Sequence, residues 1–530
     1  MEYSQLVIVV TFFVLLLLHC LLKNYKPKTS DKLPPGPKKI AIIGNLHQLA
    51  LAGSLPHHAL RQLSHKHGPL MHLQLGQISA VVASSPTMAK EITKTHDANF
   101  LQRPHLISAQ IFSYGGKDIV FAPYGDYWRQ MKKILVSELL SAKRVQSLSF
   151  IREDETAKFI DSIRASAGSP INLTSRIFSL INDSVSRATV GRKSKDQAEF
   201  VSLIRKMVAS VGGFDLSDLF PSMKFIHFIT GKKAKLEKLH KQVDKVLEII
   251  VKDHQERKIG VKEGRVEAEE EDLVDVLLRI QQSDNLDIKM TTSNVKALIL
   301  AKNTYLLFKS TGIGHMHVLS LFSYASHDIF TGGTDTSAST LEWAMTEMMR
   351  NPKVREKVQA ELRQVFKGKE IIDESDLEQL TYLKLVIKET LRVHPPTPLL
   401  IPRECSKQTI IDGYEIPVKT KVMINVWAIC RDPQYWTDAD RFIPERFDGS
   451  PIDFKGNNFE YLPFGAGRRM CPSITFGLAS IMLPLALLLY HFNWELPNGM
   501  KPENINMTER FGLAIGRKND LCLIPFIYDP

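Results

Sequence analysis

One short loop near the carboxyl end holds residues that suit a metal-bearing cofactor. It reads Phe464-Gly-Ala-Gly-Arg-Arg-Met-Cys, so a single cysteine, Cys471, follows two glycines and the cation Arg469. A lone cysteine is a poor zinc site because structural zinc takes about four nitrogen or sulfur ligands. One thiolate can, however, be the axial ligand of a haem iron, where it favours O–O bond cleavage. The loop therefore predicts a haem site, with Phe464 over the ring and Arg469 on a propionate; the plainer alternative is a glycine turn before a buried cysteine.

A second candidate is the sequence Gly332-Gly-Thr-Asp-Thr-Ser, which lies inside an otherwise helical pattern. Each glycine within a helix costs about 1 kcal/mol relative to alanine, so the pair needs an explanation. Close approach to a cofactor, or room for dioxygen, would provide one. Asp335 and Thr336 would then be an acid and a hydroxyl that relay protons to the reacting oxygen. The alternative is a weakened helix end capped by threonine or aspartate.

Two further patterns place charged or donor groups one helical turn apart. Glu389 and Arg392 share a helical face in an apolar stretch, and Arg446 could bind the same carboxylate. A buried triad of this kind adds little stability but can fix the register of packed elements. Trp128 and Lys132 supply an indole donor and a cation that could reach a propionate. The alternatives are a surface ion pair and an amphipathic helix with an interfacial tryptophan.

Composition indicates a globular protein in a reducing compartment. Of 530 residues, 44% are apolar and 24% charged, which is enough for a large core. The five cysteines are scattered and odd in number, which argues against a disulfide scaffold. The net charge of +11 suits an anionic partner. Nucleic acid is not expected, because basic residues do not alternate with aromatic ones in any patch; a membrane surface or an acidic protein fits better.

The amino-terminal segment predicts a membrane anchor. Residues 3–22 are almost wholly apolar, and at about 1.5 Å per residue such a helix spans a bilayer of about 30 Å. Lysines at 23, 26, 28 and 32 follow this run, which places the bulk of the chain in the cytosol. A cleaved signal peptide is the alternative, but the basic n-region and small-residue cleavage site are missing. Residues 23–37 form a polar linker that ends in a stiff proline-rich elbow.

The body, residues 38–530, is predicted to be predominantly α-helical with a small β portion. Short strands are expected at residues 40–43, 70–75 and 80–83. Helices are expected at 86–96, around Trp128, and at 236–255 and 272–282. A hairpin is expected over 404–424, with its turn at Asp412-Gly413.

The motifs, in this order and over nearly the whole chain, resemble the cytochrome P450 superfamily of haem-thiolate monooxygenases. Residues 388–404, with His394-Pro-Pro and Pro402-Arg-Glu, are similar to the plant microsomal A-type group. The resemblance implies the cytochrome P450 fold after a single transmembrane helix, with haem b bound through Cys471. The other residues it implies are a structural triad of Glu389, Arg392 and Arg446, propionate contacts from Trp128, Lys132, Arg403 and Arg469, and an oxygen-activation pair of Asp335 and Thr336.

The same resemblance implies an activity and a location. The protein would hydroxylate a small lipophilic secondary metabolite, such as a terpenoid or flavonoid, with dioxygen. Electrons would come from NADPH through a membrane-bound cytochrome reductase, at the cytosolic face of the endoplasmic reticulum. Loops near residues 103–115, 397–401 and 511–515 would line the pocket. Two alternatives remain: a haem-binding but impaired variant, and a reductase-independent haem-thiolate isomerase or dehydratase, against which Asp335, Thr336 and the basic surface argue.

The chain departs from the family pattern in three places. Serine stands at 473 where the family usually has glycine, and Lys132 replaces the usual arginine, which keeps the charge but loses the two-pronged donor. The third departure is residues 301–327, a segment rich in glycine, serine and aromatic residues within the predicted oxygen-binding helix. We interpret it as an in-frame insertion, such as retained non-coding sequence, that displaces Asp335 and Thr336. The alternative is a tolerated surface bulge.

Overall fold

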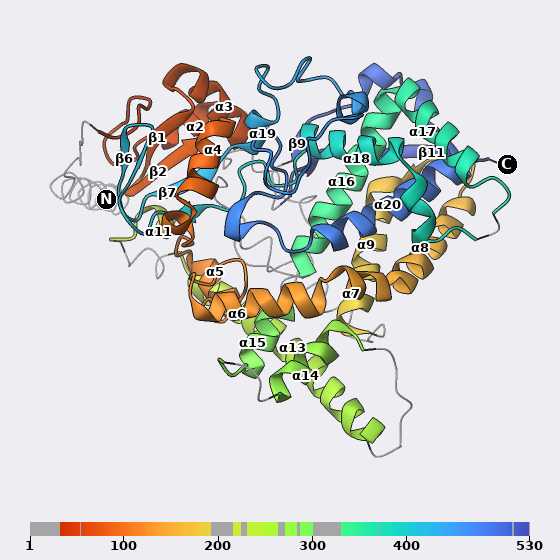
Figure 1. Ribbon diagram of the computed structural model, residues 1–530, viewed down its shortest axis with the longest axis horizontal. Helices are drawn as coiled ribbons and strands as arrows, with labels where there is room; N and C mark the ends of the chain where they lie inside the picture. Colours follow the sequence, from red (N-terminus) through yellow and green to blue (C-terminus); the bar gives the residue numbers. More distant parts are fainter. Residues whose placement is uncertain are drawn as a thin grey trace, which may run out of the picture.

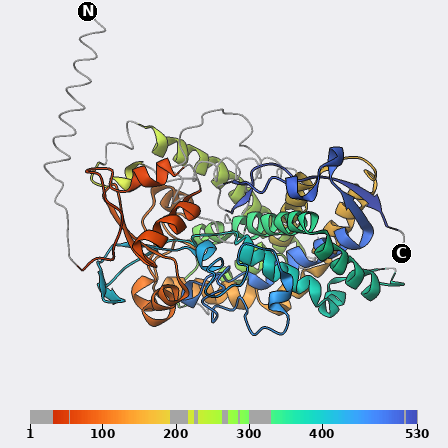
Figure 2. The same ribbon diagram turned by 90° about the horizontal axis from the view of Figure 1, so that it is seen from above.

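The computed structural model describes residues 32–52, 55–191, 216–223, 230–262, 271–283, 287–299, 330–369, 371–510 and 514–528. Helices make up most of this body and strands a small part, as predicted, and the four-stranded main sheet lies at one end (Figure 1). Both views place the β1–β2 hairpin (Leu70–Leu75 and Ile78–Ala83) and the carboxyl-terminal strand β11 (Cys522–Ile527) at opposite ends of the body (Figures 1 and 2).

The described helices of the first half of the chain extend from the sheet end to the opposite end of the body (Figure 1). They are α2 Leu46–Leu51, α3 Pro56–His67, α4 Pro86–Lys90, α5 Ile107–Phe112, α6 Asp126–Ile134, α7 Ala142–Ser147, α8 Ser149–Arg164, α9 Leu173–Val190, α11 Leu216–Leu219 and α13 Lys232–Lys262. Those of the second half are α14 Leu273–Gln282, α15 Thr292–Ile299, α16 Phe330–Arg350, α17 Pro352–Val365, α18 Tyr382–Val393, α19 Val426–Ile429 and α20 Ile474–His491.

Helix α16 runs through the centre of the described body. It packs against α9, α18 and α20 (Figure 1), and its side chains Leu341, Trp343 and Met345 have no exposed surface. Burying three such side chains stabilises the fold by several kcal/mol, at about 1.5–3 kcal/mol each. Residues near the start of α16 therefore belong to a helix that is anchored in the core.

The main sheet joins distant parts of the chain in the order β1-β2-β7-β4. Strands β1 and β2 pair antiparallel, β7 (Lys421–Ile424) runs parallel to β2, and β4 (Arg403–Glu404) closes the other edge. The remaining strands form small pairs and a three-stranded sheet; they are β3 Ile171–Asn172, β5 Thr409–Ile411, β6 Tyr414–Ile416, β8 Phe492–Glu495, β9 Glu509–Arg510 and β10 Gly516–Arg517.

The strand predictions were right in part. The strand at 70–75 is confirmed, and residues 80–83 lie within β2. The predicted strand at 40–43 is wrong, because Ile40 and Gly44 exchange backbone hydrogen bonds around a tight turn in which Ile42 has a φ of 71°. The hairpin turn is confirmed at Asp412 and Gly413, which have φ values of 51° and 79° between β5 and β6. Residues 421–424 leave that hairpin and join the main sheet.

The helix predictions agree with the structure. Residues 86–96 form α4 followed by one wider π-helical turn, and residues 236–255 lie inside α13. Helix α14 begins where predicted because Asp272 caps it. The Asp275 amide donates to Asp272 Oδ1 at 2.9 Å, and the Asp272 amide donates to Asp275 Oδ2.

The predicted anchor, residues 3–22, and the linker up to residue 31 lie outside the described residues, and the elbow that follows packs on the sheet. The His72 amide donates to the Pro35 carbonyl at 2.9 Å. A Cβ at Gly36 would lie 2.0 Å from the His72 carbonyl oxygen, so only glycine fits there. Among the described residues, one helix, α20, is long and apolar enough to cross a membrane, but 61% of it is buried in the body.

Candidate active site

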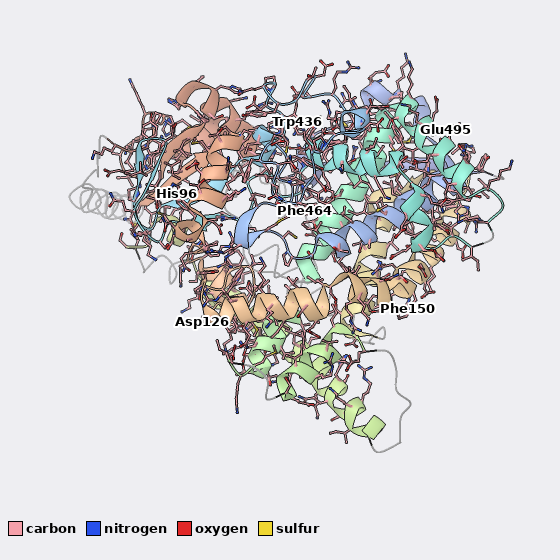
Figure 3. The ribbon with its side chains drawn as sticks, viewed as in Figure 1. His96, Asp126, Phe150, Trp436, Phe464 and Glu495 are labelled. Atoms are coloured by element: carbon pink, nitrogen blue, oxygen red, sulfur yellow. The ribbon has the colours of Figure 1, made fainter. Side chains whose placement is uncertain are left out.

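The cysteine loop is a tight turn that leads directly into α20. The Cys471 amide donates to the Phe464 carbonyl at 3.0 Å, which closes the loop. Gly467 has a φ of 71°, and a Cβ there would lie 2.2 Å from the Thr93 carbonyl oxygen. Only glycine satisfies both conditions, so the motif's glycine is explained by close packing on the neighbouring helix end. Figure 3 shows Phe464 in the middle of the molecule.

The protein surroundings alone keep Cys471 as a thiol. Burial raises the pKa of this thiol, while the Ser473 hydroxyl, 3.4 Å from Cys471 Sγ, and the charge of Lys132 lower it. A coordinating metal cation removes the proton from such a thiol outright. Ser473 has a φ of −105°, a conformation that any residue adopts, so glycine is not required at this position.

Arg403 is placed beside the loop by strand β4. Its Nη1 donates to Asp97 Oδ1 at 2.8 Å, and its Nη2 donates to the Ala466 carbonyl at 2.7 Å. Asp97 also accepts the Arg468 amide at 3.3 Å. Asp97 is therefore a site residue that the sequence did not reveal, because it lies more than 300 positions from its partners and belongs to no motif.

Arg469 and Trp128 form a stacked pair behind the loop. The guanidinium of Arg469 lies 4.4 Å from the Trp128 ring centroid. Both donate to the Ile119 carbonyl, at 3.2 Å from Arg469 Nη1 and 2.8 Å from Trp128 Nε1. Arg469 also donates to the carbonyls of Leu101 and Ala122, at 3.0 and 2.7 Å. These donors are thus gathered at one place by helix α6 and the loop that precedes it.

Lys132 completes the group one helical turn after Trp128. Its Nζ donates to the Arg468 carbonyl and lies 5.1 Å from the Trp128 ring centroid. Burial and the charge of Arg469 lower the pKa of Lys132. The structure thus brings together all four predicted propionate contacts, Trp128, Lys132, Arg403 and Arg469, around the Cys471 loop.

The charges of this group match an anionic cofactor. Burial lowers the pKa of Arg403, and burial raises the pKa of the neighbouring Asp118 to about 7, so part of its negative charge is absent at neutral pH. A cluster of cations in a desolvated place is costly unless negative charge compensates it. Two propionates would supply that charge, and the Cys471 thiol would supply the iron ligand. The residues present therefore fit a haem.

Asp335 and Thr336 lie in α16, and their position in a helix agrees with the prediction. The Thr336 hydroxyl donates to the Gly332 carbonyl, and Asp335 is buried. Helix α16 reaches the cysteine loop through α20: a Cβ at Gly477 would lie 3.6 Å from Ser337 Oγ. The acid and the hydroxyl are thus held on a helix that packs against the one that begins just after Cys471.

The structure also brings Glu389, Arg392 and Arg446 into contact. Arg392 donates through Nε and Nη2 to the two oxygens of Glu389, at 2.7 and 2.8 Å. Arg446 Nε donates to Glu389 Oε1 at 3.0 Å, and the Ile443 amide donates to the same atom at 2.8 Å. The guanidinium groups of both arginines lie near Trp436, at 5.2 and 5.9 Å from its ring centroid.

The predicted pocket loops meet where the structure describes them. Arg103 donates to the carbonyls of Ile401 and Pro402 at 2.7 and 2.9 Å, which links the first two loops. The Ile515 amide donates to the Pro396 carbonyl at 2.9 Å, which brings the third loop to the same place. Residues 511–513 lie outside the described residues.

Comparison with known proteins agrees with the family that the sequence motifs indicate. Residues 34–302 and 322–523 match the family model of cytochrome P450. The chain is 62% identical to cytochrome P450 71D8 of Glycine max over the full length of both, and 50% identical to premnaspirodiene oxygenase of Hyoscyamus muticus over 98% of each. A zebrafish cytochrome P450 solved with abiraterone has a similar fold, with a TM-score of 0.69 at 23% identity over 89% of this chain and 99% of that one.

The fold and the site together define a haem-thiolate monooxygenase. The chain belongs to the cytochrome P450 family, within its plant A-type group. The match to the family model is interrupted at residues 303–321, inside the segment that the sequence predicts to be an insertion. That segment, residues 301–327, lies outside the described residues.

Proposed function

We propose that this chain is a membrane-anchored monooxygenase that hydroxylates a small lipophilic secondary metabolite, with Cys471 as the axial haem ligand. The observation that carries the proposal is the convergence of Trp128, Lys132, Arg403 and Arg469 around the Cys471 loop. Bound haem supplies the activation of dioxygen and the insertion of one oxygen atom into a C–H bond. NADPH would supply the electrons through a partner reductase. The reductase would dock on the basic surface at the side of the haem that Cys471 would face.

The residues of the chain would have distinct tasks. Arg403 and Arg469 would orient the haem by exchanging their present bonds to backbone carbonyls for bonds to the ionised propionates. The Thr336 hydroxyl, which now donates to the Gly332 carbonyl, would turn to hold a proton near the reacting oxygen. The carboxyl group of Asp335 would replace that proton from the interior of the protein.

A terpenoid is our proposal for the class of substrate. One relative, 50% identical over almost its whole length, is named premnaspirodiene oxygenase. The pocket loops include apolar residues such as Leu106 and Leu399, both buried, which suit a hydrocarbon skeleton better than a charged one. A flavonoid or a similar metabolite is the alternative. Product analysis with a panel of sesquiterpenes and flavonoids, in the presence of reductase and NADPH, would separate the two.

The location proposed is the endoplasmic reticulum membrane, with residues 3–22 as a single span and the catalytic body in the cytosol. The elbow supports this location, because its contacts with β1 fix the point at which the chain joins the body. Removal of residues 1–22 should move the protein from the membrane fraction to the soluble fraction. Retention in the membrane fraction after this deletion would contradict a single anchor.

The test of the haem assignment is the carbon monoxide difference spectrum of the reduced protein. The full chain should show the strongly red-shifted Soret band that thiolate ligation produces. Cys471→Ser should abolish that band and all turnover, while Cys522→Ser, which changes an exposed cysteine, should leave both unchanged. The assignment would be wrong if the band survived Cys471→Ser.

A second candidate function is a haem-binding variant that residues 301–327 impair. The interruption of the family match at 303–321 favours it. A loop of this length costs little closure entropy, but a break beside Asp335 and Thr336 would displace both. Deletion of residues 301–327 should then raise haem retention and turnover. Equal values for the full chain and the deletion variant would show that the segment is a tolerated bulge.

Dependence on the reductase distinguishes a monooxygenase from the remaining alternative, a haem-thiolate isomerase or dehydratase. A monooxygenase consumes NADPH through the reductase in proportion to product formed, whereas an isomerase or dehydratase turns over without it. We expect no product when the reductase is omitted.

A further inference from the structure

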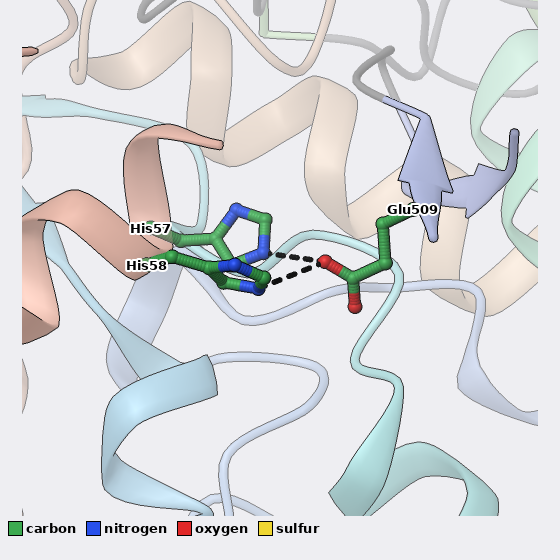
Figure 4. Close-up of side chains that lie close together, drawn as sticks. All are labelled: His57, His58 and Glu509. Carbon is green, nitrogen blue, oxygen red and sulfur yellow. Dashed lines mark hydrogen bonds and ion pairs between the residues drawn. The ribbon is translucent and has the colours of Figure 1, made fainter. Parts of the chain in front are cut away.

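Two histidines and a glutamate meet in a place that the proposed monooxygenase chemistry does not use (Figure 4). His57 and His58 lie in the first turn of α3, and Glu509 lies in β9, at the other end of the chain. His57 Nε2 is 2.8 Å and His58 Nε2 is 3.1 Å from the same oxygen, Glu509 Oε2. Three potential metal-ligand atoms thus converge within 4.8 Å of one another.

The ligand types and spacing suit zinc. Two imidazole nitrogens and one carboxylate oxygen are a set that binds Zn²⁺ with a fourth position left for water. Bonds of about 2.0–2.1 Å in a tetrahedron place ligand atoms about 3.3 Å apart. The separations of 2.8 and 3.1 Å would therefore need to widen by only about half an ångström or less.

The surrounding structure supports all three ligands before any metal binds. The His57 carbonyl accepts a hydrogen bond from Asn425 Nδ2 at 2.9 Å. The Trp427 ring packs against both imidazoles, with centroid distances of 5.2 Å to His57 and 4.2 Å to His58. Strand β9 holds Glu509 opposite Arg517 of β10. Such support lowers the cost of ordering ligands around an ion.

Zinc binding requires the hydrogens between these side chains to leave. Nε2 of each histidine faces Glu509 Oε2 and cannot bind a metal while it donates a hydrogen to that oxygen, so Zn²⁺ must displace the hydrogen to Nδ1 or to solvent. Binding therefore weakens at low pH.

Two features limit the affinity of this site for zinc. The Arg431 guanidinium lies 4.2 Å from the Trp427 ring centroid and would repel a dication. His57 Nδ1 is buried without a hydrogen-bond partner, whereas metal-bound histidines usually donate through their second nitrogen. The His58 side chain is 32% exposed but its Nε2 atom is buried, so an ion must displace this ring to enter. We therefore expect binding in the micromolar range rather than that of a structural zinc site.

A second cluster of the described residues provides a contrast. His254, Asp272 and Asp275 also lie within 4.8 Å of one another. There both carboxylates already serve the capping box of α14, with Asp272 Oδ1 accepting the Asp275 amide at 2.9 Å and Asp275 Oδ2 accepting the Asp272 amide at 3.3 Å. A metal would have to break the helix cap. No zinc binding is expected at that cluster.

We propose that His57, His58 and Glu509 form a Zn²⁺ site that links α3 to β9, separate from the haem. Isothermal titration of the purified full-length holoprotein with zinc chloride at pH 7.5 tests it. The expected result is one saturable site with a micromolar dissociation constant, and binding at least about tenfold weaker in Glu509→Gln and in His58→Gln. His65→Gln, which changes an exposed histidine of the same helix, should bind as the parent does.

Each outcome of the titration decides the proposal. His58→Gln changes a partly exposed side chain and should fold even if Glu509→Gln does not. Equal zinc affinity in the parent and His58→Gln would place the ion elsewhere and overturn the site. The absence of saturable binding up to about 100 micromolar would overturn it as well. A supporting result would include loss of binding below about pH 6, because zinc then competes with protons for the imidazoles.

Discussion

Two buried groups of charged residues in this protein contain similar side chains. They differ in how far the positive and negative charges within each group cancel. In the triad, the carboxylate of Glu389 receives donors from Arg392 and Arg446, and it has no exposed surface. Around Cys471, Asp97 pairs with Arg403, while Arg469 donates to the backbone carbonyls of Leu101, Ile119 and Ala122. The first group is complete within the protein, and the second can accept an additional anion.

The difference indicates which group holds structure and which holds a ligand. The remaining guanidinium nitrogens of Arg392 donate to the carbonyls of Cys430, Ala439 and Arg441, so the triad ties α18 to the loop that follows α19. Loss of the Glu389 charge would leave both arginines of the triad without their anion. In the second group, a buried carbonyl that loses its arginine donor costs about 1–3 kcal/mol, and charged hydrogen bonds to two propionates would offset that cost.

The largest loss of folding free energy is expected from Glu389→Gln, which tests the structural role of the triad. The substitution removes the charge between two buried guanidinium groups, and breaking a buried pair costs about 3–5 kcal/mol of folding free energy. Urea unfolding of the purified protein measures this loss. Glu445→Gln is the matched control, since Glu445 lies on the neighbouring turn and its side chain is 43% exposed. The control should lose less than about 1 kcal/mol; a loss of that size for Glu389→Gln would contradict a structural triad.

A smaller and more local effect is expected from Arg469→Lys. Lysine keeps the charge but loses the planar, two-pronged donor, so haem should be held about tenfold less tightly while the fold persists. Transfer of haem to apomyoglobin measures its rate of loss. Arg468→Lys, at a side chain that is 56% exposed, serves as the control. If Arg469→Lys reduced the free energy of unfolding as much as Glu389→Gln, the two groups would not differ as we infer.

The sequence predicted most residues of both groups, but it did not predict which opposite charges pair within them. Helical spacing placed Glu389 beside Arg392, and local patterns found α14 and the turn at Asp412. Asp97 was missed, since its pairing with Arg403 depends on how β4 packs beside the cysteine loop. The strand expected at 40–43 failed for a similar reason, because a contact with the sheet holds the chain in a turn there. Contacts between distant segments leave no periodic signal.

The smallest effect expected is that of Ser473→Gly, which restores the residue usual in the family. Ser473 precedes α20 and makes no side-chain cap bond there, so its replacement should change the free energy of unfolding by less than about 0.5 kcal/mol. Its hydroxyl lies 3.4 Å from Cys471 Sγ and lowers the pKa of the thiol. Without it, the sulfur should become a stronger electron donor, and the reduction potential of the haem should fall slightly. Potentiometric titration of the parent and the variant measures this shift. An unchanged potential together with a large loss of stability would mean that Ser473 supports the fold rather than tuning the thiolate.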